Sequence, residues 1–351
     1  MTKSSTKPLR NKTKRYNILS LFTGAGALDH GFERTGRFET RLAVEKEPIF
    51  CRTLHANQAR GALSSAAILN ASIDELAPKS ILSRYFGEHT LDGIIGGPPC
   101  ESFSSMGKQR ALGDPRGHLI FSFCKWVRRL KPSFFLFENV PHLAHRFSGE
   151  ILAQLVQSFT SAGYKVSKQI LKASDYGAAT KRKRLLIVGV RRGPYFVFPK
   201  PSHAVAASGF QLKRQRTVRD ALKGLPEPFD SEGCEPTWHK RIAHNAAVVK
   251  RFSLLSPGEQ DKVRKRWRLS LSEPSPSLVA GNLDGIRSHI HPTQPRELTN
   301  RESARIHGFD DDFVFCGNHA AVGKQIANSV PIELASALAH AIAEHLDKGS
   351  A

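Results

Sequence analysis

The sequence predicts an α/β protein whose first half is a parallel sheet covered by helices. Short apolar runs alternate with helical stretches from residue 17 to residue 192, and polar or glycine-rich turns separate them. Strands that alternate with helices form parallel, helix-covered sheets. After Arg192 the chain becomes rich in Pro, Ser, Arg and Lys and loses clear periodicity, so we expect a smaller domain there, with irregular or β structure.

Each predicted strand is a short apolar run that ends near Gly or an acidic residue. The first covers residues 17–22 and is broken by Gly24 and Gly26. The later strands are "TRLAVE", which ends at Glu45, "LDGIIGG", "SFFLFENV" and "KRLLIVGV". Helices are expected in "ALDHGFERTG", in "PIFCRTLHANQ" with its Pro at the first helical position, and in "RESARIHGF" and "PIELASALAHAIAEHL".

The charge balance favours a polyanionic partner. The 351 residues include 52 Lys and Arg against 31 Asp and Glu, which gives a formal charge of +21. The pI is near 10.1, and a value above about 9 is typical of nucleic-acid binders. A basic ribosome-associated or membrane-surface protein would have the same charge. We see no signal peptide and no apolar run near the ~18 residues of a membrane span, so we expect no membrane partner.

The cysteines argue against both a disulfide framework and a zinc site. They are odd in number, scattered, and form no C-x-x-C pair. This pattern fits a reducing cytosol, in which one or two thiols at most have a chemical role. The five are Cys51, Cys100, Cys124, Cys234 and Cys316.

The turn "FTGAG" follows the first strand and precedes a helix, so its glycines let the backbone approach a ligand closely. The spacing of Gly24, Gly26 and Gly31 is not the dinucleotide fingerprint, and no phosphate-loop G-K-[ST] is present. Glu45 ends the next strand, where an acid can accept both hydroxyls of a ribose. A nucleoside cofactor without a phosphate signature indicates S-adenosylmethionine. A plain turn and a solvated Glu45 form the alternative.

Cys100 stands in "GIIGGPPCESFSS", directly after an apolar strand. It therefore belongs at the carboxyl edge of the sheet, where open α/β sheets bind ligands. Pro98 and Pro99 restrict the loop, so the thiol is held in a defined direction. A lone cysteine is more often inert packing, but the stiff loop before it and the polar residues after it favour a nucleophile.

The chain resembles the cytosine-5 DNA methyltransferases across residues 17 to about 335. "GGPPCESFSSMGKQRALGDPRGHL" is similar to their catalytic motif and mobile loop, and "LFTGAGALDHGF" and "VEKEP" to their cofactor motifs. The remaining motifs follow in the family order as "FENV", "DYGAATKRKRLLIVG", "RELTNRESARIHGFDDDF" and "IANSVP". A full ordered set of this kind identifies a compact, prokaryotic type of DNA methyltransferase.

The resemblance implies a role for each matched residue. Cys100 would add to C6 of cytosine, Glu138 would hydrogen-bond or protonate N3, and Arg182 and Arg184 would steady the base and the catalytic loop. The alternative for Glu138 is a surface acid at a strand end, and for the arginines a solvated basic run. S-adenosylmethionine would contact Phe22, Gly24, Gly26, Glu45, Pro98, Asn328 and Ser329.

Four positions depart from the family pattern, and one of them is Ser277, which stands where Thr is usual. Thr180 replaces the Gln that usually stands two residues before the first motif arginine. Ser72 occupies the place of the Asp that takes the adenine amino group, with Asp74 two residues on, so the adenine contact stays open. Ala327 replaces the Gly that opens the closing motif, whereas Asn328, Val330 and Pro331 match.

The resemblance also implies a duplex DNA partner and base flipping, because the target base inside a duplex is out of reach. The loop 101–117 would close over the DNA and contact it through Ser104, Lys108, Gln109, Arg110 and Arg116. In the target region, "DKVRKRWRLS" has five basic residues among its first eight and an interleaved Trp267. We expect Arg264 and Arg266 to contact phosphates, with a solvated basic face as the alternative.

We therefore expect four segments: a basic disordered tail at 1–16, a catalytic and cofactor-binding domain at 17–192, a target recognition domain at 193–299, and a C-terminal segment at 300–351 that packs back on the catalytic domain. The expected protein is a monomeric, cytoplasmic, nucleoid-associated enzyme of a restriction-modification system with a cognate endonuclease. Two alternatives remain. A cytosine-5 RNA methyltransferase would share the fold, but its tRNA branch has a Cys-Phe-Thr signature that is missing here. An inactive DNA-binding subunit would not need Cys100, Glu138 and both arginines.

Overall fold

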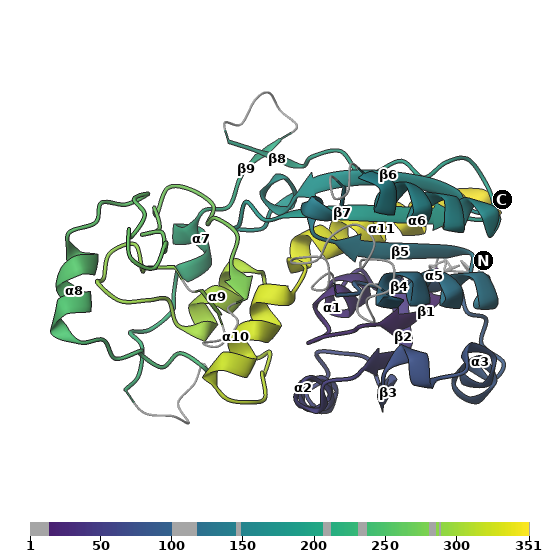
Figure 1. Ribbon diagram of the computed structural model, residues 1–351, viewed down its shortest axis with the longest axis horizontal. Helices are drawn as coiled ribbons and strands as arrows, with labels where there is room; N and C mark the ends of the chain where they lie inside the picture. Colours follow the sequence, from purple (N-terminus) through teal and green to yellow (C-terminus); the bar gives the residue numbers. More distant parts are fainter. Residues whose placement is uncertain are drawn as a thin grey trace, which may run out of the picture.

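The computed structural model describes residues 14–99, 118–144, 149–205, 212–230, 237–280, 286–287 and 289–350. Its main feature is a seven-stranded sheet in the order β3-β2-β1-β4-β5-β7-β6. Within this sheet β7 runs antiparallel to its neighbours, β5 and β6, so the prediction of a parallel sheet is wrong for this strand (Figure 1). The strands of this sheet are β1 Tyr16–Leu21, β2 Phe38–Glu45, β3 Ala67–Asn70, β4 Gly93–Gly96, β5 Phe134–Asn139, β6 Lys165–Lys172 and β7 Lys183–Val190.

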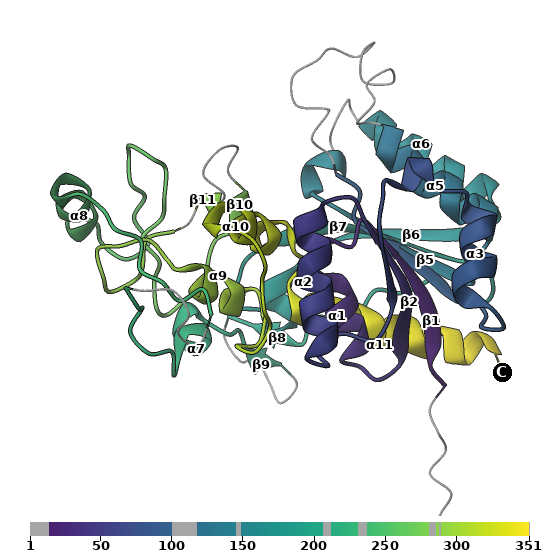
Figure 2. The same ribbon diagram turned by 90° about the horizontal axis from the view of Figure 1, so that it is seen from below.

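Helices cover both faces of this sheet, which makes three layers (Figure 2). One face packs on α3 Pro78–Phe86, α5 His118–Leu130 and α6 Glu150–Ser161. The other packs on α1 Ala27–Glu33 and α11 Ile332–Ser350, and α2 Pro48–Ala59 lies beside β2 and β3. Short 3-10 turns follow three strands: η1 Ile73–Glu75, η3 Pro141–Ala144 and η5 Ala173–Tyr176.

The alternation of side chains along β5 explains why a run of four apolar residues is needed there. Phe135 and Phe137 enter the core under α5 and α6, whereas Phe134 and Leu136 enter the core under α11. Successive side chains of a strand point to opposite faces, so a strand covered on both sides is apolar throughout. This confirms the α/β class predicted from the sequence.

A smaller lobe extends from the carboxyl edge of the sheet (Figure 1). It has little regular structure, as expected from its composition: β8 His203–Ala204 pairs with β9 Lys213–Arg214, and β10 Val279–Ala280 pairs with β11 Ile286–Arg287. Its helices are α7 Val218–Leu222 and α8 Ala246–Ser253, and α9 Asn300–Ile306 and α10 His319–Asn328 lie beside α7 and β10. The chain then returns to the sheet through α11.

One apolar stretch is longer than the sequence analysis expected. His319–Gly349 has the length and hydropathy of a membrane span. It is interrupted between α10 and α11, and 67% of its most apolar part is buried inside the protein. Since a buried core helix passes the same test, this stretch is weak evidence for a membrane span.

Candidate active site

The carboxyl edge of the sheet brings together a buried acid and a buried arginine. Glu138 lies near the end of β5, and Arg184 lies at the start of the antiparallel β7, so both face the same edge. Arg184 Nε is 2.5 Å from Glu138 Oε1, and the two residues are only 7% and 8% exposed. Burial raises the pKa of Glu138, and the Arg184 guanidinium offsets part of the rise. The arrangement gives a carboxyl group poised to hold a proton.

The turn before Cys100 is fixed against this pair. A Cβ at Gly97 would overlap a carboxylate oxygen of Glu138, so a side chain there would displace this carboxylate. Asn139 follows the acid, is buried, and donates through Nδ2 to the carbonyl oxygen of Pro98 at 3.0 Å. The backbone leading to Cys100 therefore runs directly over Glu138.

Cys100 itself lies outside the described residues, and so do the predicted DNA contacts of the loop, Ser104, Lys108, Gln109, Arg110 and Arg116. Two other cysteines are poor nucleophiles. Cys51 and Cys124 are buried, and burial raises their thiol pKa to about 11 and about 12. A thiolate forms readily only where its pKa is low.

Arg182 has a different environment from Arg184. Its buried guanidinium donates to the carbonyl oxygens of Leu278 at 2.8 Å and Ala327 at 2.5 Å. It therefore links β7 to the smaller lobe at Leu278 and to the closing motif at Ala327. Thr180, which stands where the family has Gln, accepts from Arg182 N at 3.3 Å and approaches Pro276 O at 3.5 Å. The shorter side chain thus keeps a supporting role at this junction.

The expected cofactor residues of the first two strands lie together at the same edge. Glu45 is buried, and its carboxylate accepts from the backbone N–H groups of Gly24 at 2.8 Å and Glu47 at 2.9 Å. Gly24 and Gly26 have φ of +61° and +80°, which explains why glycine is required. Phe22 also has a positive φ, 55°, so the strand ends at Leu21, one residue earlier than predicted. These groups suit a nucleoside ligand, because a ribose would find a carboxylate acceptor beside an open backbone turn.

The closing motif reaches this edge between α10 and α11. Asn328 is exposed and its side chain forms no hydrogen bond within the described chain, so it is available to a ligand. Ser329 is buried and donates from Oγ to Ile326 O at 2.7 Å. At the third strand, Asp74 accepts from Ser122 Oγ at 2.6 Å and faces α5, whereas Ser72 caps η1. The adenine contact thus stays open between them.

His307 is a site residue that the sequence analysis missed. It is fully buried, its Nδ1 lies 2.8 Å from Ser329 Oγ, and its Nε2 has no hydrogen-bond partner within the described chain. Burial and the nearby charge of Arg184 lower its pKa to about 3, so the ring is neutral at physiological pH. The histidine stands inside the quoted "RESARIHGF", but a single histidine in a helical pattern carries no signal of burial.

The two arginines predicted to contact phosphates have different environments in the structure. Arg264 is exposed, as a phosphate contact must be. Arg266 is 6% exposed and forms a buried ion pair with Glu297, so the expectation that it contacts DNA is wrong for this conformation. Trp267, between the buried Arg266 and Arg268, is 37% exposed. Because the backbone of this segment is irregular, the spacing of its residues does not predict which side chains are buried.

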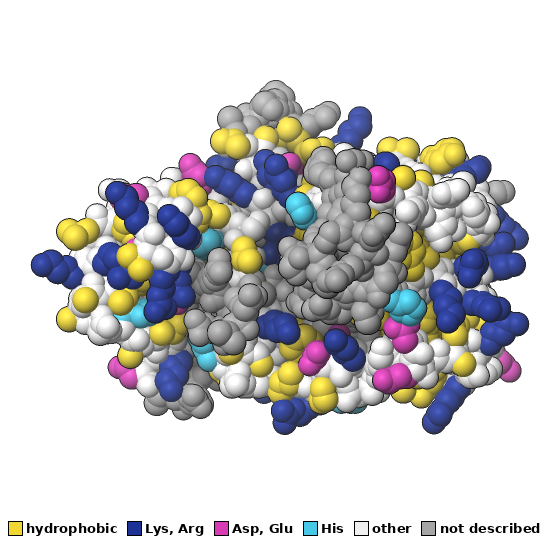
Figure 3. All heavy atoms as spheres, in the orientation of Figure 1, with side chains coloured by type: hydrophobic (Ala, Val, Ile, Leu, Met, Phe, Trp, Pro, Cys, Tyr) yellow, Lys and Arg dark blue, Asp and Glu magenta, His cyan; other side chains and the backbone are white. Residues whose placement is uncertain are grey.

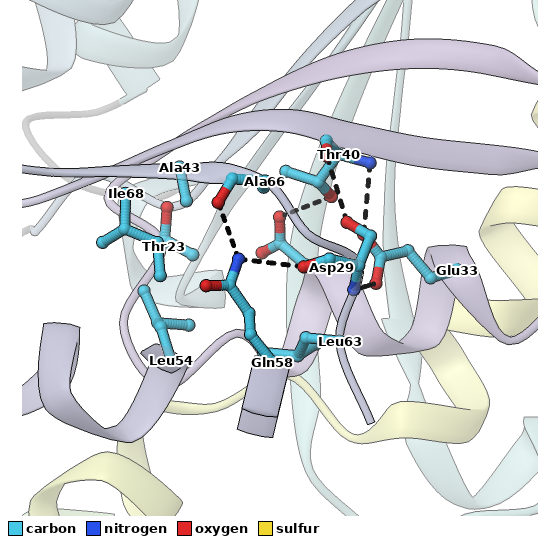
Figure 4. Close-up of a pocket in the computed structure, with 11 residues that line it drawn as sticks. Thr23, Asp29, Glu33, Thr40, Ala43, Leu54, Gln58, Leu63, Ala66 and Ile68 are labelled. Carbon is cyan, nitrogen blue, oxygen red and sulfur yellow. Dashed lines mark hydrogen bonds between the residues drawn. The ribbon is translucent and has the colours of Figure 1, made fainter. Parts of the chain in front are cut away.

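A cavity of about 20 Å³ lies behind the glycine turn, between α1, α2 and β2. Figure 4 shows the carboxylates of Asp29 and Glu33 entering this region, with Thr40 Oγ1 donating to Asp29 at 3.1 Å. Ser20 Oγ donates to the other oxygen of Asp29 at 3.0 Å. Burial raises the pKa of Asp29 to about 7, and the Glu33 carboxylate adds to the rise. The space suits about one water molecule and is too small for a nucleoside.

Sheet order, glycine turn and acid–arginine pair together define an α/β methyltransferase fold of the S-adenosylmethionine-dependent kind. The family model described as C-5 cytosine-specific DNA methylase matches residues 16–344. The chain therefore belongs to the C-5 cytosine-specific DNA methylase family, the DNA cytosine-5-methyltransferases, as the motif resemblance predicted.

Individual relatives agree with this assignment. The chain is 33% identical to M1.HphI, a Type II methyltransferase of Haemophilus parahaemolyticus, over 92% of this chain and 86% of the relative. It is also 33% identical to M.PspPI, a Type II methyltransferase of Psychrobacter sp. (strain TA137), over 95% of this chain and 80% of the relative. Among solved structures, a DNA modification methyltransferase encoded within a prophage (E. coli) has 28% identity and a TM-score of 0.75, covering 95% of this chain and 99% of that one. EhMeth of Entamoeba histolytica, at 16% identity, a TM-score of 0.65 and the same coverages, shares the fold.

Proposed function

We propose that this methyltransferase acts on duplex DNA by flipping a cytosine out of the helix, adding Cys100 to C6 and transferring a methyl group to C5. The observation that carries the proposal is the buried Glu138–Arg184 pair directly under the turn that leads to Cys100. Glu45, Gly24 and Asn328 are proposed to hold S-adenosylmethionine, which supplies an electrophilic methyl group when bound.

Each residue of the site has a defined task in this mechanism. C5 of cytosine is a poor nucleophile because the ring is electron-deficient and aromatic. Addition of the Cys100 thiolate forms a C6–S bond, and Glu138 stabilises the electron pair that reaches N3 by a proton or a hydrogen bond. C5 can then take the methyl group. Loss of the C5 proton and cleavage of the C6–S bond restore the aromatic ring and free the thiol.

The arginines position these groups. Arg184 holds the Glu138 carboxyl at 2.5 Å and fixes its direction. Arg182 binds the carbonyl oxygens of Leu278 and Ala327, so it keeps the target region and the closing motif in place beside the base. Neither guanidinium has to move a proton, since arginine stays charged in proteins.

We also propose the biological setting. Several relatives are named Type II methyltransferases, which supports a role beside a cognate restriction endonuclease. The basic chain would then act as a monomer on cytoplasmic, nucleoid-associated DNA, with residues 193–299 as the target recognition domain and Arg264 among its phosphate contacts.

Trapping with 5-fluorocytosine tests the covalent step. Fluorine at C5 cannot leave as a proton, so duplex DNA with this base at the target should form a stable adduct with the enzyme. Bisulfite sequencing of DNA from cells that express the chain identifies the target beforehand. An active enzyme that forms no adduct would contradict covalent addition. Methyl label on adenine, or on RNA alone, would overturn the DNA cytosine activity.

A further inference from the structure

The edge of the sheet opposite the candidate active site carries a cluster of exposed cations. The cations come from the last turn of α5, the residue after it, the first residue of β6 and the two residues that follow β7. We name this cluster the distal basic face. It consists of Arg128, Arg129, Lys131, Lys165, Arg191 and Arg192, all exposed.

Backbone contacts hold these residues at one edge. Arg191 N donates to Ser133 O at 3.0 Å, and Arg191 Nη1 donates to Lys131 O at 3.2 Å. Lys165 lies opposite Val190 in the β6–β7 pair, and its Nζ donates to Gly193 O at 2.5 Å. Lys and Arg side chains gather at the right-hand end of the molecule in Figure 3, where α5, β6 and β7 meet in Figure 1.

The cations of this face have no acidic partner among the residues that the structure describes. No member of the distal basic face forms an ion pair with Asp or Glu within the described chain. Asp347, on the neighbouring end of α11, is already bound by Arg37 at 2.7 Å and by the Tyr16 hydroxyl at 2.7 Å. Exposed arginines elsewhere do have acidic partners, as in the 3.0 Å pair of Arg214 with Asp220 and the 3.7 Å pair of Arg34 with Asp310.

The distal basic face is separated from the active site by the sheet itself. Glu138 lies near one end of β5, and Lys131 precedes the other end. A six-residue strand is about 20 Å long at roughly 3.3 Å per residue. A duplex held at the carboxyl edge, between the two lobes, therefore leaves these cations unused.

We propose that the distal basic face binds the phosphates of a second DNA segment, so that one enzyme molecule holds two duplexes at once. Uncompensated cations on a rigid edge bind a polyanion by releasing its counterions, without reading sequence. DNA is the polyanion that this enzyme already engages, and a second contact would let it pass from one segment to another. This inference concerns DNA binding and does not depend on the covalent mechanism proposed above.

A bridging assay tests the proposal with the full-length enzyme. One biotinylated duplex that carries the target is fixed on beads, and retention of a second, fluorescent duplex without the target is measured over a range of salt concentrations. The wild-type enzyme should retain the second duplex. R128E/R192E should retain at least about tenfold less at low salt, and the salt slope of its retention should fall by about 2, since two phosphate contacts are lost.

R52E/R60E is the matched control, because Arg52 on α2 and Arg60 directly after it are exposed and the change in charge is the same. It should bridge like the wild type, and both variants should methylate a short single-site duplex at the wild-type rate. Light scattering fixes the oligomeric state in parallel. Bridging that is absent in the wild type, equally reduced in the control, or unchanged in R128E/R192E would overturn the proposal. Binding to anionic vesicles in place of the second duplex would overturn it as well.

Discussion

Glu138 and Arg184 are 46 positions apart in the chain, yet their side chains meet at 2.5 Å in a buried site. The contact depends on the reversed direction of β7, which brings the start of that strand to the edge where β5 ends. Because the acid is buried, its pKa depends on the guanidinium beside it. Arg184 therefore controls both the orientation and the protonation of the Glu138 carboxyl group.

Arg184→Gln should raise the pKa of Glu138 further, because it removes the positive charge that offsets burial. If protonated Glu138 is the active form, the alkaline limb of the pH–rate profile moves to higher pH. The rate should also fall by about 100-fold, since the carboxyl loses its orientation. Single-turnover methylation from pH 6 to pH 10 measures both effects. A lower rate with an unmoved limb would mean that Arg184 acts only in packing.

Cys100→Ser should abolish methyl transfer and 5-fluorocytosine trapping, because an alkoxide does not form at neutral pH. DNA binding should remain, since the hydroxyl occupies nearly the same space. Cys316→Ser is the control and should keep full activity. Gel-shift titration and label transfer from S-adenosylmethionine measure the two properties separately. Turnover in Cys100→Ser would remove this thiol from the mechanism.

Glu45→Gln should weaken binding of S-adenosylmethionine by about 10- to 100-fold, which corresponds to the loss of a charged hydrogen bond. Glu47→Gln is the matched control, because Glu47 donates to this carboxylate through its backbone N–H, which the substitution keeps. Calorimetric titration of both variants without DNA gives the comparison. Equal affinities for the two variants would show that the ribose is held elsewhere.

Arg264→Ala should affect DNA binding and Arg266→Ala should affect stability, although the two residues are only two positions apart. Loss of the exposed Arg264 should weaken DNA binding and reduce its salt dependence, with little effect on stability. Loss of Arg266 should leave the Glu297 carboxylate buried without its arginine and destabilise the protein by about 3–5 kcal/mol. Urea unfolding and salt-dependent DNA titration distinguish the two. A stable Arg266→Ala protein with weakened DNA binding would restore the original expectation.

Asp29→Asn should make the protein more stable at pH 8 but not at pH 4. The pKa of Asp29 is about 7 in the folded protein and near 3.8 when unfolded. The folded state therefore binds a proton that the unfolded state has lost, so this group lowers stability as pH rises from about 4 to 7. The cost at pH 8 is on the order of a few kcal/mol. Thermal unfolding at both pH values, with the exposed Asp312→Asn as control, measures it. A pH-independent difference would assign the effect to hydrogen bonding alone.

The sequence predicted those parts of the protein in which local pattern and burial coincide. Strands such as β5 are apolar because both faces are covered, and the glycines after β1 have the positive φ that their turn requires. The edge strand β6 was not foreseen. Most of its residues are polar, since an edge strand has little core to fill.

The contacts within the site were harder to predict. The order of the motifs predicts that Glu138 and Arg184 belong to one active site. Their direct contact depends on the direction of β7, which no local sequence pattern specifies. His307 and Arg266 illustrate the same limit. Each is buried by elements distant in sequence, so its surroundings cannot be deduced from its neighbours in the chain.

The covering of one sheet face by α11 has a consequence for biosynthesis. Residues 332–350 leave the ribosome more than 300 residues after β1, yet Leu334, Leu338 and Ile342 complete the core around Phe32 and Leu136. During most of its translation the nascent chain therefore lacks the helix that covers one apolar face of the sheet. An exposed apolar face favours aggregation and binding to chaperones. Because α11 also follows the closing motif with Asn328 and Ser329, we expect a newly made chain to gain activity only once this last helix has packed on the sheet.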